Sequence, residues 1–422
     1  MARWRVVGLL FAAALAGCHR KLLVVYVVHG AFPAAISAFS TNDLISGGLT
    51  RIHADATNSQ VLDVPAGSGD RNFMAVHPSG RYLYVTNDLD SSVSAYSVGA
   101  GGRLTRLDAD PTTAVIDDFA TGGNPLSVAV HPNGKFVYVV NSIIQTPLAP
   151  TTNGTITTFE VDPNNGTLYR RDNDPLSAQI DDLPAGWNPY QITVEPKGRF
   201  AYVGRWDPAP PSIPPGWMPI TRVSAYLLDT SHGGLTRVDA DPLTPVMDDI
   251  VINGDGPQCM AMTPDGKFLY VGNIPLGGPP ELVGFSIHAG TGALSHFGDF
   301  NMGKKPWSVA IDPSGKFAHV AVDGTTKDFT SMRTHQIDPT TGALTLVNAN
   351  PPTPGTEDIP TDRGFRSITI DPTGRFVFLD ATNPILQEFR VDPATGRLSP
   401  GATDVTGGHV SSRVSIAAIV LP

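Results

Sequence analysis

The architecture of this chain is clearest in residues 76–85, which read Val76-His77-Pro78-Ser79-Gly80-Arg81-Tyr82-Leu83-Tyr84-Val85. An apolar strand enters a Pro-x-Gly turn, and a second strand of alternating residues leaves it. Proline presets φ within such a turn and glycine readily takes a positive φ, so the chain reverses tightly. The segment therefore predicts a β-hairpin.

Five further segments repeat this hairpin, with their turn glycines 49 to 68 residues apart. Their turns are His131-Pro132-Asn133-Gly134-Lys135, Glu195-Pro196-Lys197-Gly198-Arg199, Thr263-Pro264-Asp265-Gly266-Lys267, Asp312-Pro313-Ser314-Gly315-Lys316 and Asp371-Pro372-Thr373-Gly374-Arg375. A second hairpin follows each one and closes through a Gly-x-Leu unit such as Gly102-Arg103-Leu104. Pairs of hairpins repeated along a chain indicate the four-stranded blades of a propeller.

A seventh copy at the start of the chain is incomplete. Residues 25–28 and 36–39 supply two of its strands, but its first strand is missing. The apolar tail, residues 414–421, has no hairpin partner. We therefore predict an all-β, seven-bladed propeller with four-stranded blades, one domain over residues 22–422, whose ring is closed by the C-terminal strand in the N-terminal blade.

The composition agrees with this prediction and excludes other classes. Glycine (43) and proline (38) are abundant among the 422 residues, which disfavours long helices. A hydrophobic share of 41% with only 16% charged residues excludes a disordered acidic chain. The net charge of −10 disfavours nucleic acid as a partner, because phosphate binding needs a basic face.

The N-terminus has the pattern of an export signal. Arg3 and Arg5 precede an apolar run over residues 6–16, too short for the ~20 residues that span a bilayer. Leu15-Ala16-Gly17-Cys18 follows and resembles the bacterial lipobox. The resemblance implies removal of residues 1–17, acylation of Cys18, a short linker over 18–21, and a periplasmic or cell-surface protein that meets the membrane only through its lipid. The alternative is an ordinary signal peptide with an incidental cysteine.

The long loops are predicted to share one face of the ring, opposite the short turns. Residues 142–153, 205–221 and 274–280 form Pro-rich, stiff loops between second and third strands. Because function usually lies on loops held by a rigid scaffold, we place the site on this face, at the mouth of the central channel. The partner expected there is a small molecule or a protein.

The residues at this mouth follow from counting back from each Pro-x-Gly turn. They include Arg71, Asn72, Tyr190, Gln258, Trp307 and Arg366, with Trp187 close by. Arginine grips carboxylate or phosphate, and flat aromatic rings stack on sugar faces, so a small anionic or sugar-like ligand is expected. The alternative for the aromatic residues is packing between blades.

Acidic segments recur in the connections that lead from one blade to the next. Asp108-Ala109-Asp110-Pro111 with Asp117-Asp118 is one copy, and the connection before Trp307 lacks the element. Carboxylates grouped in this way could hold Ca²⁺, which needs six to eight oxygens. Turn-forming, solvated acids are the alternative that we prefer, and we assign no metal ligand and no cofactor.

The hairpins and the Asp-Pro-x-Thr-Gly turns, such as Asp392-Pro393-Ala394-Thr395-Gly396, resemble the seven-bladed propeller lactonase family, which includes the propeller-type 6-phosphogluconolactonases. The resemblance covers residues 22–422. It implies lactone hydrolysis, with Arg71 and Asp88 at the matching positions; Arg366, at the channel mouth, could join Arg71 in holding the oxyanion. The family's Arg-His pair is Arg71-Asn72 here, and its Asn-Glu-Leu is Asn87-Asp88-Leu89.

Two further classes of function stay open beside hydrolysis. One is a lipid-anchored propeller that binds a ligand without turning it over, and we favour this one because asparagine at position 72 cannot act as a general base. The other is a scaffold for protein partners.

Overall fold

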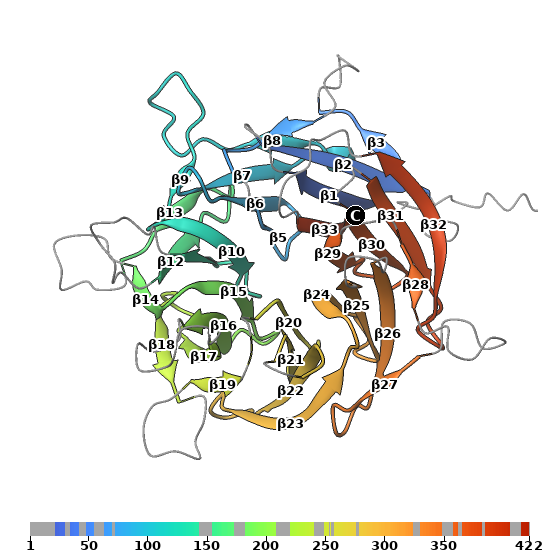
Figure 1. The fold of residues 1–422 in the computed structure, drawn as a ribbon. Helices are drawn as coiled ribbons and strands as arrows, with labels where there is room; N and C mark the ends of the chain where they lie inside the picture. The colour runs from blue at the N-terminus through green and yellow to red at the C-terminus, as the bar shows by residue number, and fades with distance from the viewer. Residues whose placement is uncertain are drawn as a thin grey trace, which may run out of the picture.

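The structure is a computed structural model. It describes residues 22–29, 34–41, 48–54, 63–69, 72–142, 154–172, 182–207, 220–239, 249–252, 254, 257–275, 278–323, 330–347, 358–361, 365–381, 385–405 and 415–421. Seven antiparallel sheets are arranged in a ring around a central channel, in chain order (Figure 1). Each sheet is one blade, four strands deep from the channel to the rim, so the predicted seven-bladed propeller is confirmed.

The first blade is made from both ends of the chain, and the other six follow in order. The first contains β1 (Leu22–His29), β2 (Ala35–Thr41), β3 (Thr50–Ile52), β4 (Val64–Pro65) and β33 (Ser415–Leu421). The second contains β5 (Met74–Val76), β6 (Tyr82–Asn87), β7 (Ser92–Val98), β8 (Leu104–Arg106) and β9 (Phe119–Ala120). The third contains β10 (Asn124–Val130), β11 (Phe136–Ser142), β12 (Gly154–Val161), β13 (Leu168–Arg170) and β14 (Leu183–Gly186). The fourth contains β15 (Pro189–Val194), β16 (Phe200–Asp207), β17 (Ile220–Leu228), β18 (Leu235–Val238) and β19 (Ile250–Ile252).

The remaining three blades have the same plan. The fifth contains β20 (Cys259–Met262), β21 (Phe268–Asn273), β22 (Glu281–Ile287) and β23 (Leu294–Asn301). The sixth contains β24 (Lys305–Ile311), β25 (Phe317–Asp323), β26 (Ser331–Ile337), β27 (Leu344–Leu346) and β28 (Ile359–Pro360). The seventh contains β29 (Phe365–Ile370), β30 (Phe376–Ala381), β31 (Ile385–Val391) and β32 (Leu398–Val405). A three-residue 3₁₀ turn, η1 (Ala100–Gly102), is the one helical element within these described ranges.

The ring closes as predicted. The C-terminal strand β33 pairs antiparallel with β1, from Leu22↔Leu421 to Val28↔Ser415, and becomes the innermost strand of the first blade. The inner strand of this blade therefore comes from the end of the chain and its other strands come from the beginning. The two termini hold each other in the sheet.

The core lies between neighbouring blades. One cluster joins Tyr84 and Val93 of the second blade to Val137 and Phe159 of the third. Hydrogen bonds reinforce this packing, because the buried Tyr84 hydroxyl donates to the Gly166 carbonyl of the next blade at 3.1 Å. The hydroxyls of Tyr26, Tyr202 and Tyr270 make the same bond to Gly102, Gly292 and Gly342. At these four places a turn glycine thus anchors a tyrosine of the preceding blade.

The acidic segment of the second blade, residues 108–118, lies at the rim of that blade rather than between blades. In five blades the third strand pairs on its outer side with a short fourth strand and then with a separate two- to four-residue strand, as β7 pairs with β8 and β9. The acidic segment is inserted between these two pieces. In the fifth blade β23 runs unbroken along β22, with one bulge, as expected for the connection that lacks the element.

Candidate binding site in the central channel

The innermost strands enclose a cavity of about 220 Å³ in the central channel. Tyr190, Gln258 and Trp307, three of the predicted mouth residues, line it. One step deeper, hydroxyl groups ring the channel, from Ser127, Ser308, Ser367 and Ser415. The structure therefore brings together aromatic, amide and hydroxyl side chains from six different blades.

β-Bulges accompany several of these mouth residues. The ladder register shifts between Pro189 and Gln191 in β15 and between Pro306 and Ser308 in β24. The skipped residues are Tyr190 and Trp307. A bulge leaves one residue out of the ladder and re-aims its side chain, which accounts for these rings facing the cavity. Equivalent shifts occur around positions 126 and 366.

A hydrogen-bonded girdle stiffens the cavity wall. Ser415 Oγ accepts from the Met74 amide at 3.2 Å, and Ser308 Oγ accepts from the Ile368 amide at 3.2 Å. The Gln191 side chain makes two hydrogen bonds to the Met260 backbone. It accepts from the amide at 2.8 Å and donates to the carbonyl at 3.1 Å. Ser127 and Ser367 link their blades to the next in the same way. These side chains thus join neighbouring inner strands around the channel.

The two aromatic residues are themselves positioned by neighbours. Trp307 Nε1 donates to Asp323 Oδ2 at 3.2 Å. Tyr190 meets Phe73 edge to face, with ring centroids 6.5 Å apart. Trp187 is half-buried on the segment that leads into β15, outside the cavity lining. Next to it, Asn188 holds a φ of 34°, in the left-handed region that asparagine tolerates better than most residues.

Asn72 and Asp88 of the second blade lie outside the cavity lining. Asn72 is fully buried, and its side-chain nitrogen donates to the Thr86 carbonyl at 2.7 Å rather than lining the cavity. Asp88, 7% exposed, directly follows β6. Arg71 and Cys18 lie outside the described residues. Arg366 belongs to β29, and its side chain lies outside the described part of the chain.

Cys259 lines the cavity, but its thiol is unreactive. Its side chain is 5% exposed, and burial raises the pKa of the thiol to about 12. Its Sγ lies 3.7 Å from the Pro306 carbonyl. A protonated, buried thiol is a poor nucleophile.

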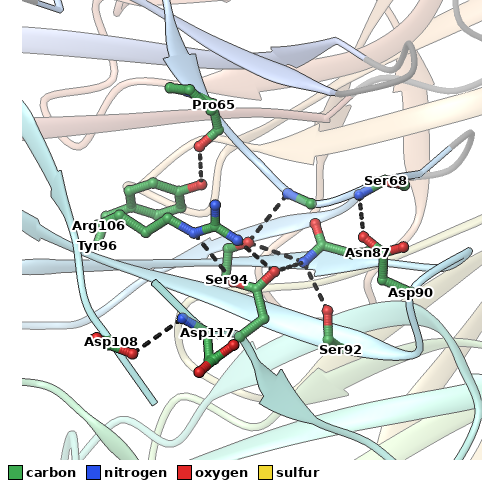
Figure 2. Close-up of polar contacts among 12 residues, drawn as sticks. Pro65, Ser68, Asn87, Asp90, Ser92, Ser94, Tyr96, Arg106, Asp108 and Asp117 are labelled. Carbon is green, nitrogen blue, oxygen red and sulfur yellow. Dashed lines mark hydrogen bonds and ion pairs between the residues drawn. The ribbon is translucent and has the colours of Figure 1, made fainter. Parts of the chain in front are cut away.

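A polar network that the sequence analysis did not predict lies at the end of β6 in the second blade (Figure 2). Asn87 Nδ2 donates to Ser92, Ser94 and Asp118 at 3.1, 2.9 and 3.3 Å. Asp118 in turn pairs with Arg106 of β8 at 2.6 Å. Figure 2 shows Asn87, Ser92, Ser94 and Arg106 close together, and their bonds to Asp118 anchor the rim insertion to the blade.

The same ion pair recurs at a fixed spacing. Arginines 51, 106, 170 and 237 pair with aspartates 63, 118, 182 and 249, each twelve residues later. The sixth blade has leucine at the arginine position, and Asp358 pairs instead with Arg333 and Lys304. This twelve-residue Arg…Asp spacing is the sequence signal that could have revealed the network.

The partners of Asp249 favour its ionised form. Burial opposes ionisation of Asp249, but hydrogen bonds and charge from Arg205, with Ser224 and Arg237, outweigh it and lower the pKa of the carboxyl. Asp207 extends the cluster by pairing with both Arg205 and Arg222. Among the described residues, no group of three or more His, Cys, Asp or Glu side chains is placed to hold a metal ion.

Seven blades around a channel with a small, partly polar cavity between the described inner strands define a seven-bladed β-propeller. The chain belongs to the family described as "Lactonase, 7-bladed beta-propeller", whose family model matches residues 49–207 and 221–360. These two segments cover well over half of the chain.

Individual relatives match either a shorter segment of the chain or nearly all of it at low sequence identity. The chain is 29% identical to the 6-phosphogluconolactonase of Pectobacterium atrosepticum over 150 residues, which are 35% of this chain and 38% of that protein. It therefore spans well under half the length of this relative. Two solved structures have the same fold, each with a TM-score of 0.65. A putative 6-phosphogluconolactonase from Bacteroides uniformis is 16% identical and aligns over 94% of this chain and 100% of its own. The Pseudomonas aeruginosa periplasmic gluconolactonase is 17% identical, over 95% and 100%.

Proposed function

We propose that this protein is a lipid-anchored, extracytoplasmic propeller that binds a small anionic or sugar-like ligand in its central cavity. The observation that carries the proposal is the convergence of Tyr190, Gln258 and Trp307 on one cavity rimmed by serine hydroxyls. Aromatic faces suit the apolar side of a sugar ring, and the amide and hydroxyls suit its polar edge. A volume near that of about seven water molecules fits a small ligand.

The extracytoplasmic location is supported by the N-terminal Leu15-Ala16-Gly17-Cys18 motif. A fold neighbour described as a periplasmic gluconolactonase is consistent with it. Within the described ranges, no helix is long and apolar enough to cross a membrane. Mass spectrometry of the mature protein is expected to find an acylated Cys18 at the N-terminus; a free Cys18 thiol, or a mature chain that begins elsewhere, would contradict the anchor.

Calorimetric titration with a panel of sugar lactones, sugar acids and sugar phosphates tests the ligand proposal. Trp307→Ala is expected to weaken binding of the preferred compound about tenfold, because a lost stacking ring costs about 1.4 kcal/mol. Trp307→Phe is the matched control that keeps a ring but loses the hydrogen bond to Asp323. Binding that is unchanged in Trp307→Ala would contradict the site.

Lactone hydrolysis is a second candidate, favoured by the family match. Hydrolysis needs a base to activate water and a cation to hold the oxyanion that forms on the carbonyl oxygen. Asp88 would take the proton from water, the hydroxide would add to the carbonyl carbon, and the ring C–O bond would break as its oxygen is reprotonated. Arg71 and Arg366 would stabilise the oxyanion.

Acid release from gluconolactone by the purified chain tests hydrolysis. Turnover that falls at least a hundredfold in both Arg71→Ala and Asp88→Asn would support this mechanism, since one oxyanion donor contributes about 10² to 10³ in rate. Turnover that survives Arg71→Ala would remove that residue from the site. Binding without turnover would contradict hydrolysis and leave ligand binding as the function.

A further inference from the structure

We infer that the protein sits on its membrane with the tight-turn face against the bilayer and the cavity mouth pointing away. The tight-turn face is the one formed by the Pro-x-Gly turns and the Gly-x-Leu turns. The inference rests on the lipid anchor proposed at Cys18. It concerns which surface meets the lipid, which the anchor by itself does not determine.

The point at which the chain enters the ring is the first argument. The hydroxyls of Tyr26 in β1 and Tyr84 in β6 make the same bond to the next blade, so these residues are equivalent. Counting back four residues, Leu22 is level with Gly80, the glycine of a Pro-x-Gly turn. Leu22 also pairs with Leu421. The chain therefore enters the first blade on the tight-turn face, and the C-terminal strand ends there.

The length of the linker is the second argument. Only residues 19–21 separate Cys18 from Leu22. Four Cα-to-Cα steps reach at most about 14 Å. The strand β1 is 8 residues long, so it crosses about 26 Å from one face to the other. A membrane-embedded Cys18 therefore cannot reach around the ring to bring the long-loop face to the bilayer while β1 stays paired.

Charge is the third argument. A basic residue follows each of the six Pro-x-Gly turns: Arg81, Lys135, Arg199, Lys267, Lys316 and Arg375. All are exposed except Arg199, which is half-buried and paired with Glu195. Arg20 and Lys21 add two basic residues to the linker just before Leu22. Such a ring of cations fits the anionic phospholipid headgroups of a bacterial membrane.

The acidic residues of the tight-turn face leave the ring of basic residues that follows the Pro-x-Gly turns with a positive net charge. Glu195, Asp312 and Asp371 belong to the same turns but are buried, where they accept hydrogen bonds from their own turns. Asp265 is exposed and pairs with Lys267 at 3.2 Å. The remaining exposed or half-buried aspartates, 162, 229, 338 and 392, lie in the turns between third and fourth strands, farther from the channel.

This orientation leaves the cavity accessible. The mouth residues and the long loops face the aqueous compartment, so a dissolved ligand reaches Trp307 and Tyr190 without crossing the protein–membrane contact. The tight turns, which carry none of the cavity-lining residues, face the lipid.

Fluorescence quenching on vesicles tests the orientation. The full chain is expressed in a bacterial host, purified from membranes and reconstituted into phosphatidylglycerol-containing vesicles with a headgroup-attached quencher. One variant carries a fluorophore at Lys197→Cys, in a Pro-x-Gly turn, and the matched variant carries it at Leu89→Cys, in the turn after β6; both positions are exposed. The buried Cys259 is kept, and the chain without added cysteine controls for its labelling.

Strong quenching at position 197 and at least fivefold less at position 89 are expected. Equal or reversed quenching with an acylated Cys18 would overturn the orientation while the anchor stands. A Cys18 that mass spectrometry finds without lipid would overturn the anchor and this inference with it.

The basic ring has its own test in the same vesicles. Lys135→Gln, Lys267→Gln and Lys316→Gln together are expected to reduce quenching at position 197 about twofold. Lys305→Gln, an exposed lysine at the opposite end of an inner strand, is the control that should leave it unchanged. Equal quenching in the triple variant would remove the contribution of charge.

Discussion

Lowering the pH from 7 to 5 is expected to destabilise the ring through two buried histidines of the sixth blade. His319 lies in β25 and His335 in β26, and they are 0% and 4% exposed. Burial lowers the pKa of each from 6.5 to about 4. His319 uses its Nδ1 in a 3.0 Å hydrogen bond with Thr334, and no charged partner holds a proton on either ring strongly enough to offset burial.

The sign follows from which state takes up protons. The folded protein keeps both rings neutral until the pH approaches 4, whereas the unfolded chain protonates them below 6.5. This stability is therefore fully present above pH 6.5 and is lost as the pH falls toward 4. Between pH 6.5 and 5 each histidine lowers the free energy of unfolding by about 1.36 kcal/mol per pH unit. Over these 1.5 units the loss is about 2 kcal/mol per histidine and about 4 kcal/mol for both.

Urea unfolding at pH 7 and pH 5 measures this loss, in the wild type and in a His319→Gln/His335→Gln double variant. The readout is the difference between the two pH values, so any baseline cost of the substitutions cancels. Burial also lowers the pKa values of His77, which is half-buried, and His131, which is buried, and they add a smaller loss of the same sign. The double variant should lose less than half of what the wild type loses. An equal loss in both would refute this reasoning.

Three further perturbations test the fold. Tyr84→Phe removes the hydrogen bond to Gly166 and should cost about 1 kcal/mol in urea unfolding, whereas Tyr138→Phe, whose hydroxyl has no partner among the described residues, should cost almost nothing; equal costs would contradict the inter-blade bond. Arg106→Gln leaves Asp118 without its cation and should cost about 2 kcal/mol by the same measurement, with no loss counting against the network. Ser415→Ala removes the acceptor for the Met74 amide and should raise hydrogen exchange at that amide; unchanged exchange would show that the girdle does not hold the closing strand.

Much of the architecture could be predicted because its signals are local. Each Pro-x-Gly turn fixes the end of two strands, and the positive φ of Gly80 and Gly134 agrees with the turn geometry expected from the residues alone. The missing strand of the first blade could be inferred because an unpaired apolar tail has few other places to go. β33 occupies that place.

The site could be predicted only in part, because side-chain direction at the mouth depends on bulges. Counting from the turn puts Asn72, Tyr190 and Trp307 at equivalent positions. Tyr190 and Trp307 stand at bulges and line the cavity, whereas Asn72 precedes β5 and its amide donates to the Thr86 carbonyl. Sequence spacing carries no such information.

The rim network was missed for a different reason. The acidic segments stood out as clusters, but their partners lie twelve residues earlier, on a separate strand. Arg106 and Asp118 meet because β8 and β9 pair with successive parts of the same edge of β7. The pairing becomes visible in the sequence once the repeats are aligned by blade.

A crystal structure of the protein with the preferred compound from the titration panel tests the central claim most directly. The account predicts the ligand in the channel cavity, with its ring against Trp307 and a polar group within hydrogen-bond distance of the Gln258 side chain. A ligand bound at the rim, on the tight-turn face or between blades, with the cavity left to water, would contradict it.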